Sequence, residues 1–452
     1  MSILIRNATV VTAQTTYFSD IGVSEGKISG IGVGLKLDAE TEIDASGMYV
    51  CPGGVDPHCH LGDDFENASK AAACGGTTCV IEPSVQEPGK SLTQALESWQ
   101  EKARNRAAID FGFHVTIVDP NSRALDEIPR LVDLGVLSFK IFMASFPGTP
   151  MLDDGSMLEV FSRVRRAGGI VILHAENGHI IDFLTKKSLS AGRRSTKDCA
   201  ACHPRSAESE AVSRAILLAS LTSAPVFFYH ISCMSALDVI RKARSSGSMV
   251  YAETCPHYLF LTEQVYEQGN IEGAKYLCAP PLRDNSDQKE LWKALVEGGI
   301  QVVSSDHVGL NIRSQKELAD IDFTKIPLGI PGIGTRVPLM FSAALAGRVS
   351  LSRFVDLVST APAKLFGLYP RKGEIQVGSD GDLVVFDPTI EEVMGKSSFC
   401  QTYDYSPYEG FRLKGAPRFV IARGEVVAAN GAYVGRPGAG QYLVRSAAST
   451  AV

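Results

Sequence analysis

Residues 53–62 read GGVDPHCHLG and follow an apolar run, GMYVCP (residues 47–52), that has the composition of a β-strand. One residue separates His58 from His60, and alternate residues of a strand project from the same face. We therefore expect the two imidazoles to point toward one object, such as a metal ion. Two histidines at this spacing are weak evidence alone, because a metal site needs further ligands.

Beyond this stretch, short β-rich runs alternate with segments of helical periodicity, which predicts βα units around a parallel sheet. The eight candidate strands cover residues 48–52, 77–82, 111–118, 139–144, 170–176, 226–232, 249–254 and 301–307. Candidate helices cover residues 91–106, 156–167, 206–221, 234–245 and 287–297. Eight such units predict a (β/α)8 TIM-like barrel with its chemistry at the carboxyl ends of the strands. A doubly wound open sheet is the alternative, but no G-x-G-x-x-G motif follows the first strand.

The sequence pattern at the two ends of the chain differs from that of the middle. Short alternating runs separated by turn residues, such as ILIRNATVV near the start and APRFVIARGEVVAANG near the end, predict antiparallel strands. We expect one small β-sandwich domain built from both termini. Residues 1–50 and 371–452 would form it, the latter including a tail, and residues 51–370 would form the metal-dependent barrel.

Composition excludes several classes of protein. A net charge of −6 gives no reason to expect binding to nucleic acid or to anionic membranes. No apolar run reaches the ~20 residues needed to span a bilayer, and the N-terminus lacks a signal-peptide layout. We therefore expect a cytoplasmic protein whose ten cysteines form no disulfide framework. The C-x-x-C-H pattern at Cys199–His203 matches haem attachment, but it occurs once and without an export signal, so we treat it as coincidence.

Four further polar residues lie on or just past predicted barrel strands. They are Lys140, His174, His230 and Asp306. A single histidine at a strand end is more often a hydrogen-bonded core residue than a ligand. Their joint occurrence with the H-x-H pair, at the end of a barrel where active sites lie, favours a metal centre. Imidazole and carboxylate ligands suit zinc or a similar divalent ion.

At this point the pattern resembles the amidohydrolase superfamily, in its branch of hydantoinases, dihydropyrimidinases and allantoinases. The motifs that carry the resemblance include GGVDPHCH, FKIFMA, ILHAENGHII, FYHISCMSALDVIRKA, AETCPHYLFLT, APPLRD and SSDH. The resemblance implies two divalent metal ions, expected to be zinc, and six ligand residues: His58, His60, Lys140, His174, His230 and Asp306. His58 and His60 would hold one ion with Asp306, and His174 and His230 the other. Carbon dioxide would carboxylate the Lys140 amine, so that it bridges both ions.

The resemblance also implies the reaction. A hydroxide bridging the metals would open the cyclic amide of a hydantoin- or dihydropyrimidine-like ring, with Asp306 carrying the proton to the leaving nitrogen. Allantoinase and cyclic imide hydrolase are alternatives. A non-enzymatic scaffold of this fold is disfavoured because all six ligand positions are present. Dihydroorotase is disfavoured because the arginine that typically follows H-x-H is absent. The implied partners are a small cyclic amide substrate and further copies of the chain, as a dimer or tetramer.

The sequence departs from the family pattern around the substrate. Hydantoinases usually have a tyrosine that holds the oxyanion where this chain has Ser145, followed by Phe146. Leu328 in KIPLGIPG replaces a common asparagine. We expect a substrate pocket formed by Phe65, Ser145, Phe146, Ala279 and Leu328. The apolar members indicate an apolar ring substituent, although each of them could equally be a packing residue.

Overall fold

The structure is a computed structural model that describes residues 2–313 and 322–446. The chain divides into two compact units. The first comprises Met1–Ile81, Lys102–Gly112 and Gly332–Val452, and the second comprises Glu82–Glu101 and Phe113–Pro331.

A nine-stranded sheet joins the two ends of the chain within the first unit. Along the sheet the order is β19 (Ala432–Tyr433), β18 (Glu425–Ala429), β17 (Arg412–Ala422), β16 (Leu383–Val393), β5 (Tyr49–Pro52), β1 (Ser2–Val11), β2 (Thr16–Ser24) and β3 (Lys27–Gly32), with β4 (Thr41–Asp44) beside β1. β5 pairs with β1 on one side and with β16 on the other. The β-rich segments predicted at both termini therefore share one hydrogen-bonded sheet, and their arrangement as a sandwich stays a prediction.

An eight-stranded sheet carries the remaining long strands. Its order is β14 (Val302–Val303), β13 (Val250–Thr254), β12 (Val226–Phe228), β11 (Ile170–His174), β10 (Ser138–Phe142), β9 (Asp110–Thr116), β8 (Thr77–Val85) and β6 (Gly54–Asp56). Neighbours from β9 to β14, and β6 with β8, pair in parallel. Every residue of β11 and β12 is buried, as expected for parallel strands covered on both faces. The predicted α/β class and seven of the eight predicted strands are confirmed.

The prediction of residues 48–52 as the first barrel strand is wrong. These residues form β5 of the nine-stranded sheet, and the three-residue β6 takes the expected place beside β8. The chain changes sheets at Gly53, where an added Cβ would lie 2.1 Å from Thr78 Oγ1. The Gly53 N–H donates to Asp382 O, whereas the Gly54 N–H donates to Gly76 O. A strand as short as β6 leaves no periodic signal in the sequence.

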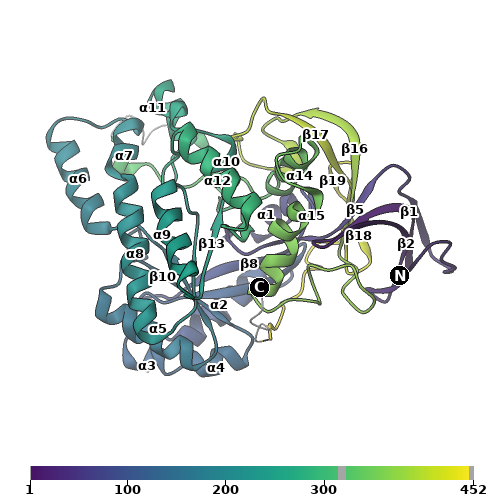
Figure 1. The fold of residues 1–452 in the computed structure, drawn as a ribbon, viewed down its shortest axis with the longest axis horizontal. Coiled ribbons are helices and arrows are strands. Elements are labelled where there is room, and N and C mark those ends of the chain that lie inside the picture. The colour runs from purple at the N-terminus through teal and green to yellow at the C-terminus, as the bar shows by residue number, and fades with distance from the viewer. Residues whose placement is uncertain (1, 314–321, 447–452) are drawn as a thin grey trace. The chain divides into compact units, whose positions relative to one another are not determined.

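All five predicted helices are present, with ends displaced by three residues or fewer. They are α2 (Leu92–Ala103), α5 (Asp154–Arg166), α8 (Arg205–Thr222), α9 (Met234–Ser245) and α12 (Asn285–Glu297). The described part of the second unit also contains the helices α3 (Ser122–Leu125), α4 (Ile128–Asp133), α6 (Gly178–Ser190), α7 (Thr196–Cys202), α10 (Pro256–Phe260) and α11 (Asn270–Ala274). The first unit contains α1 (Phe65–Cys74), α14 (Arg336–Leu345), α15 (Leu351–Val355) and α16 (Ala361–Leu365). In the second unit α8 packs against both α5 and α9 (Figure 1).

The sequence of α5 explains both its start and its orientation. Asp153 precedes the helix, and its carboxylate accepts the Ser156 N–H at 2.7 Å, which satisfies a backbone donor of the first turn. The buried side chains of α5 recur at helical spacing: Met157, Val160, Phe161 and Val164. This apolar stripe is the face that the helix buries.

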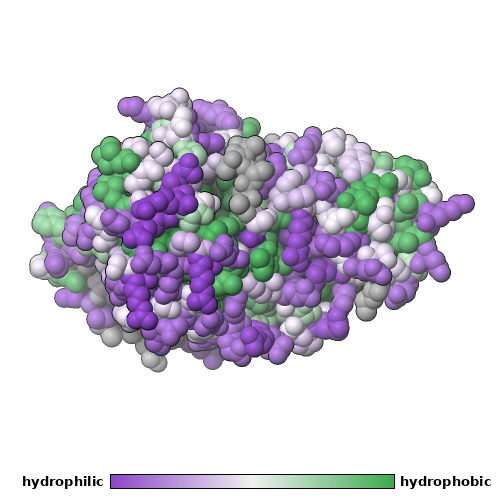
Figure 2. Space-filling model, turned by 90° about the horizontal axis from the view of Figure 1, so that it is seen from below, coloured by the Kyte–Doolittle hydropathy of each residue, from purple (hydrophilic) through white to green (hydrophobic). Residues whose placement is uncertain are grey.

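The surface and the cysteines bear on two further expectations. Across residues 2–313 and 322–446, no helix is long and apolar enough to cross a membrane. Figure 2 shows a face on which hydrophilic residues predominate, with hydrophobic residues between them. Cys74 and Cys400 form a disulfide, and the other eight cysteines are buried and form no disulfide among the described residues. This single pair leaves the expectation of no disulfide framework a prediction.

A buried lysine binds three carboxylates in the first unit. Lys372 Nζ lies 2.7 Å from both Asp110 and Asp382 and 3.0 Å from Asp380. Arg423 Nη1 adds a second cation 2.9 Å from Asp110. Burial alone would lower the pKa of Lys372, but the three carboxylates raise it, so the amine stays charged. The cluster joins segments far apart in the sequence.

Replacing Lys372 should therefore destabilise the protein strongly. Lys372→Met leaves buried carboxylates without their main counter-charge, which costs about 3–5 kcal/mol. Arg371, whose side chain is 41% exposed and 3.0 Å from Asp380, is the matched control. Arg371→Met should cost no more than about 1 kcal/mol. Urea unfolding of both variants measures the difference, and equal losses would contradict the assigned role of the cluster.

Candidate metal centre

His58 and His60 come shortly after β6, and buried polar groups of the same unit fix the chain there. The His58 N–H donates to Asp56 Oδ1 at 3.4 Å, and Arg336 Nε lies 3.6 Å from Asp56 Oδ2. The two imidazole centroids are 5.3 Å apart in an edge-to-face arrangement. The expectation of one regular strand through both histidines is wrong, because only Cys59–His60 forms a strand (β7), after a bend at Pro57. The rings are nevertheless neighbours.

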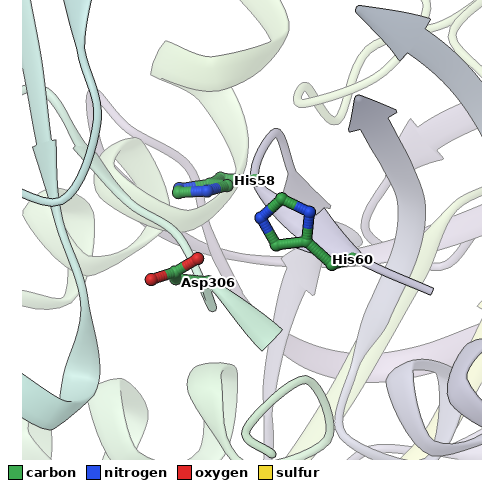
Figure 3. A group of neighbouring side chains, drawn as sticks. All are labelled: His58, His60 and Asp306. Carbon is green, nitrogen blue, oxygen red and sulfur yellow. The ribbon is translucent and has the colours of Figure 1, made fainter. Parts of the chain in front are cut away.

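Among the described residues, side chains of the second unit have the composition of a metal site. Cys255, His257 and Asp306 each offer one ligand atom, and these atoms lie within 4.8 Å of one another. Figure 3 labels Asp306 together with His58 and His60, the predicted ligands that belong to the first unit. Except for the half-buried His60, all these residues are buried. Imidazole, carboxylate and thiolate donors in this number fit a divalent transition metal.

Lys140 lies in β10 with its amine out of water. Its Nζ lies 4.7 Å from the Phe142 ring centroid and 4.5 Å from that of Tyr229. Burial lowers the pKa of Lys140 to about 8, although the charges of Asp306 and Glu253 act in the opposite direction. A lysine in such a place is a candidate functional residue, because an ordinary ammonium is expensive to desolvate.

His174 and His230 come together from neighbouring strands. His174 is the last residue of β11, and His230 lies just beyond β12. His174 Nδ1 and His230 Nε2 are 2.9 Å apart, so one ion could bind both nitrogens. His230 has a φ of 40°, in a region that residues other than glycine rarely adopt. Strained backbone of this kind is typical of functional sites.

Asp306 has the same conformation just after β14. Its φ is 46°, and its side chain is only 8% exposed. The sequence missed three buried neighbours of this site: Glu253, Cys255 and His257. A signal for them did exist, because they end or follow β13 in the run AETCPHYL, where the carboxyl end of a parallel strand lies. Glu253 Oε1 accepts the His230 N–H at 3.3 Å and so supports a predicted ligand.

Phe146 and Ser145 lie beside the predicted ligand His174. The Phe146 ring meets the His174 imidazole edge to face, with centroids 4.8 Å apart. Phe146 also packs against the small apolar cluster of Ala144, Ile181 and Ala207. Ser145 is exposed, and its Oγ accepts the Met151 N–H at 3.1 Å. The Ser145 hydroxyl therefore closes a turn of the chain.

The remaining residues of the predicted pocket occupy different surroundings. Phe65 is fully buried at the start of α1, where its ring meets Phe111 with centroids 6.2 Å apart. Ala279 and Leu328 are both partly exposed. They belong to neighbouring segments, since the Gly329 N–H donates to Leu277 O at 2.8 Å.

Comparison with known proteins adds to this geometry. The profile of the amidohydrolase family matches residues 49–427. A D-hydantoinase of Geobacillus stearothermophilus is 43% identical, over 99% of this chain and 97% of its own length. A D-phenylhydantoinase of Escherichia coli O1:K1 / APEC is 37% identical, over 98% of both chains.

The solved structures agree with the sequence relatives. The crystal structure of dihydropyrimidinase from Brevibacillus agri NCHU1002 matches with a TM-score of 0.96 and 42% identity. The match covers 99% of this chain and 100% of that one. Because both kinds of match extend over nearly the whole chain, the protein belongs to the amidohydrolase family, in the branch of the hydantoinases and dihydropyrimidinases.

Proposed function

We propose that this protein hydrolyses the amide bond of hydantoin- or dihydropyrimidine-like rings in a metal-dependent reaction. The observation that carries the proposal is a set of buried side chains on or just after strands of the parallel sheet, in a chain whose relatives are named hydantoinases: Lys140, His174, His230 and Asp306. The proposed ligands of two zinc ions are these four residues with His58 and His60. A pair of such ions, when bound, lowers the pKa of water and polarises a carbonyl group.

The properties of Lys140 support its carboxylation. The amine nitrogen must lose its proton before it can attack the carbon of CO2, and the pKa of about 8 leaves a neutral fraction near neutral pH. The product is an N-carboxylate, with one proton released to solvent. The change replaces a buried cation by an anion suited to bind metal ions. The electrostatic repulsion between an ammonium group and metal cations is thereby removed.

Asp306 is the proposed proton carrier. It takes the proton from the attacking water and delivers it to the ring nitrogen as the carbon–nitrogen bond breaks, which leaves an open-chain acid. Its backbone φ of 46° is a strained conformation of the kind that clusters at functional sites.

The pocket favours an apolar substituent on the ring. Phe146 offers an aromatic wall next to His174, and the exposed Ser145 provides no phenol to stabilise an oxyanion. We propose that more reactive or aryl-substituted rings are preferred over dihydrouracil.

For the fold, we propose that the parallel sheet forms a closed barrel and that both termini build a β-sandwich. We also propose that the protein is a homo-oligomer with a cytoplasmic location.

Replacing Asp306 by asparagine should separate folding from catalysis. The amide has nearly the shape of the carboxylate but cannot accept the proton, so Asp306→Asn should lower turnover of a hydantoin by about 10²–10⁴-fold. Zinc content and the melting temperature, measured on the same samples, show whether the site is still assembled. Near-normal turnover in a zinc-loaded, folded variant would refute the role of Asp306.

The substrate preference depends on the side chain at position 145. Wild-type protein should have a higher kcat/KM for 5-phenylhydantoin than for dihydrouracil, and Ser145→Tyr should raise kcat for dihydrouracil. An oxyanion donor contributes about 2.7–4 kcal/mol, so the gain can reach two orders of magnitude. Ser145→Ala is the control, because it removes the hydroxyl bond to Met151 without adding a donor. A wild-type preference for dihydrouracil, together with no effect of Ser145→Tyr, would contradict the proposal.

A further inference from the structure

Glu176 is a fully buried carboxylate that binds two imidazoles. Its Oε2 lies 2.9 Å from His174 Nε2, and its Oε1 lies 2.9 Å from His203 Nδ1. All three residues belong to the second unit. Neither Glu176 nor His203 is among the ligands that the family resemblance implies, so this pairing has no part in the proposed reaction as described above.

The bond to Glu176 determines which nitrogen of His174 can face a metal ion. A carboxylate accepts protons, so the Nε2 of His174 is the nitrogen that carries hydrogen. The other nitrogen, Nδ1, then has its lone pair available, and Nδ1 is the atom 2.9 Å from His230 Nε2. In metalloproteins, a carboxylate that binds the far side of a ligand histidine fixes its tautomer and ring orientation.

Other buried residues of the second unit hold His203 in place. It lies at the junction of α7 and α8, and Arg283 Nη1 donates to its backbone carbonyl at 2.6 Å. Arg283 is itself buried and pairs with Glu208 at 3.1 Å. Glu208 Oε1 accepts the N–H of Ser232, two residues after His230, at 2.9 Å. One buried network therefore connects the residues that follow His174 with those that follow His230.

We propose that Glu176 is a positioning residue for the metal ligand His174, and that His203 positions Glu176. This inference rests on the proposed function, in which His174 binds a metal ion. It also gives a role to the last residue of the C-x-x-C-H run, which haem attachment does not explain. Glutamine cannot replace Glu176 fully, because its single carbonyl oxygen cannot accept from both imidazoles as two carboxylate oxygens do.

Zinc affinity tests the inference without relying on activity. Metal-free full-length protein is titrated with zinc against a chromophoric chelator, for the wild type, Glu176→Gln and Glu176→Asp. Loss of a supporting partner of a metal ligand costs about 10–100-fold in metal affinity. We expect Glu176→Gln to weaken one of two zinc ions by this factor and to leave the other unchanged. Glu176→Asp should weaken the same ion, because its shorter side chain cannot span both imidazoles.

Asp287→Asn is the matched control. Asp287 is also a buried carboxylate of the second unit, but it binds Arg205 at 2.6 Å. Its replacement should leave both zinc affinities unchanged. Equal zinc loss in Asp287→Asn and Glu176→Gln would assign Glu176 a merely structural role and overturn the inference. So would unchanged zinc affinity in Glu176→Gln. A wild-type protein that binds no zinc would instead contradict the proposed function itself.

A second measurement remains decisive if the Glu176 variants do not fold. The ¹⁵N spectrum of histidine-labelled, zinc-loaded wild-type protein reports the tautomer of each ring. His174 should carry its proton on Nε2, and this signal should weaken or shift in His203→Gln, which removes the partner of Glu176. A proton on Nδ1 of His174 would overturn the inference, since that nitrogen could not then bind metal.

Discussion

The desolvation of the Lys140 amine is the constraint on which the proposed site depends. The amine lies against the rings of Phe142 and Tyr229, where burial lowers its pKa to about 8 despite the nearby charges of Asp306 and Glu253. A buried lysine that remains an unmodified cation destabilises the folded state. Its presence in β10 is explained if the side chain is converted to an anion that metal ions hold in place.

The parallel sheet provides the framework for that chemistry. β10 to β13 are short strands that pair in parallel. Lys140 lies within β10, and β11 to β13 end in or are closely followed by polar residues. His230 and Asp306 leave their strands through a positive φ, which turns each side chain at a backbone cost of about 1–3 kcal/mol. At His230 a buried partner offsets part of this cost, since Glu253 accepts the His230 N–H.

Much of this could be predicted from the sequence, because strand-end residues and helices leave local signals. Lys140, His174, His230 and Asp306 were found since each follows an apolar run. The strand at residues 48–52 is assigned to the wrong sheet because the chain changes sheets at Gly53, and no periodicity of the sequence reveals such a change. Glu176 and His203 were missed as partners because they are 27 positions apart and meet only through tertiary folding.

The most direct test of the central claim is carbon-13 NMR of the zinc-loaded protein prepared in ¹³C-bicarbonate. Protein carrying a carboxylated Lys140 should give one carbamate resonance, which is absent from Lys140→Met and disappears when the metal is removed and the pH lowered. An active, zinc-replete wild-type protein without that resonance would contradict the account of the site.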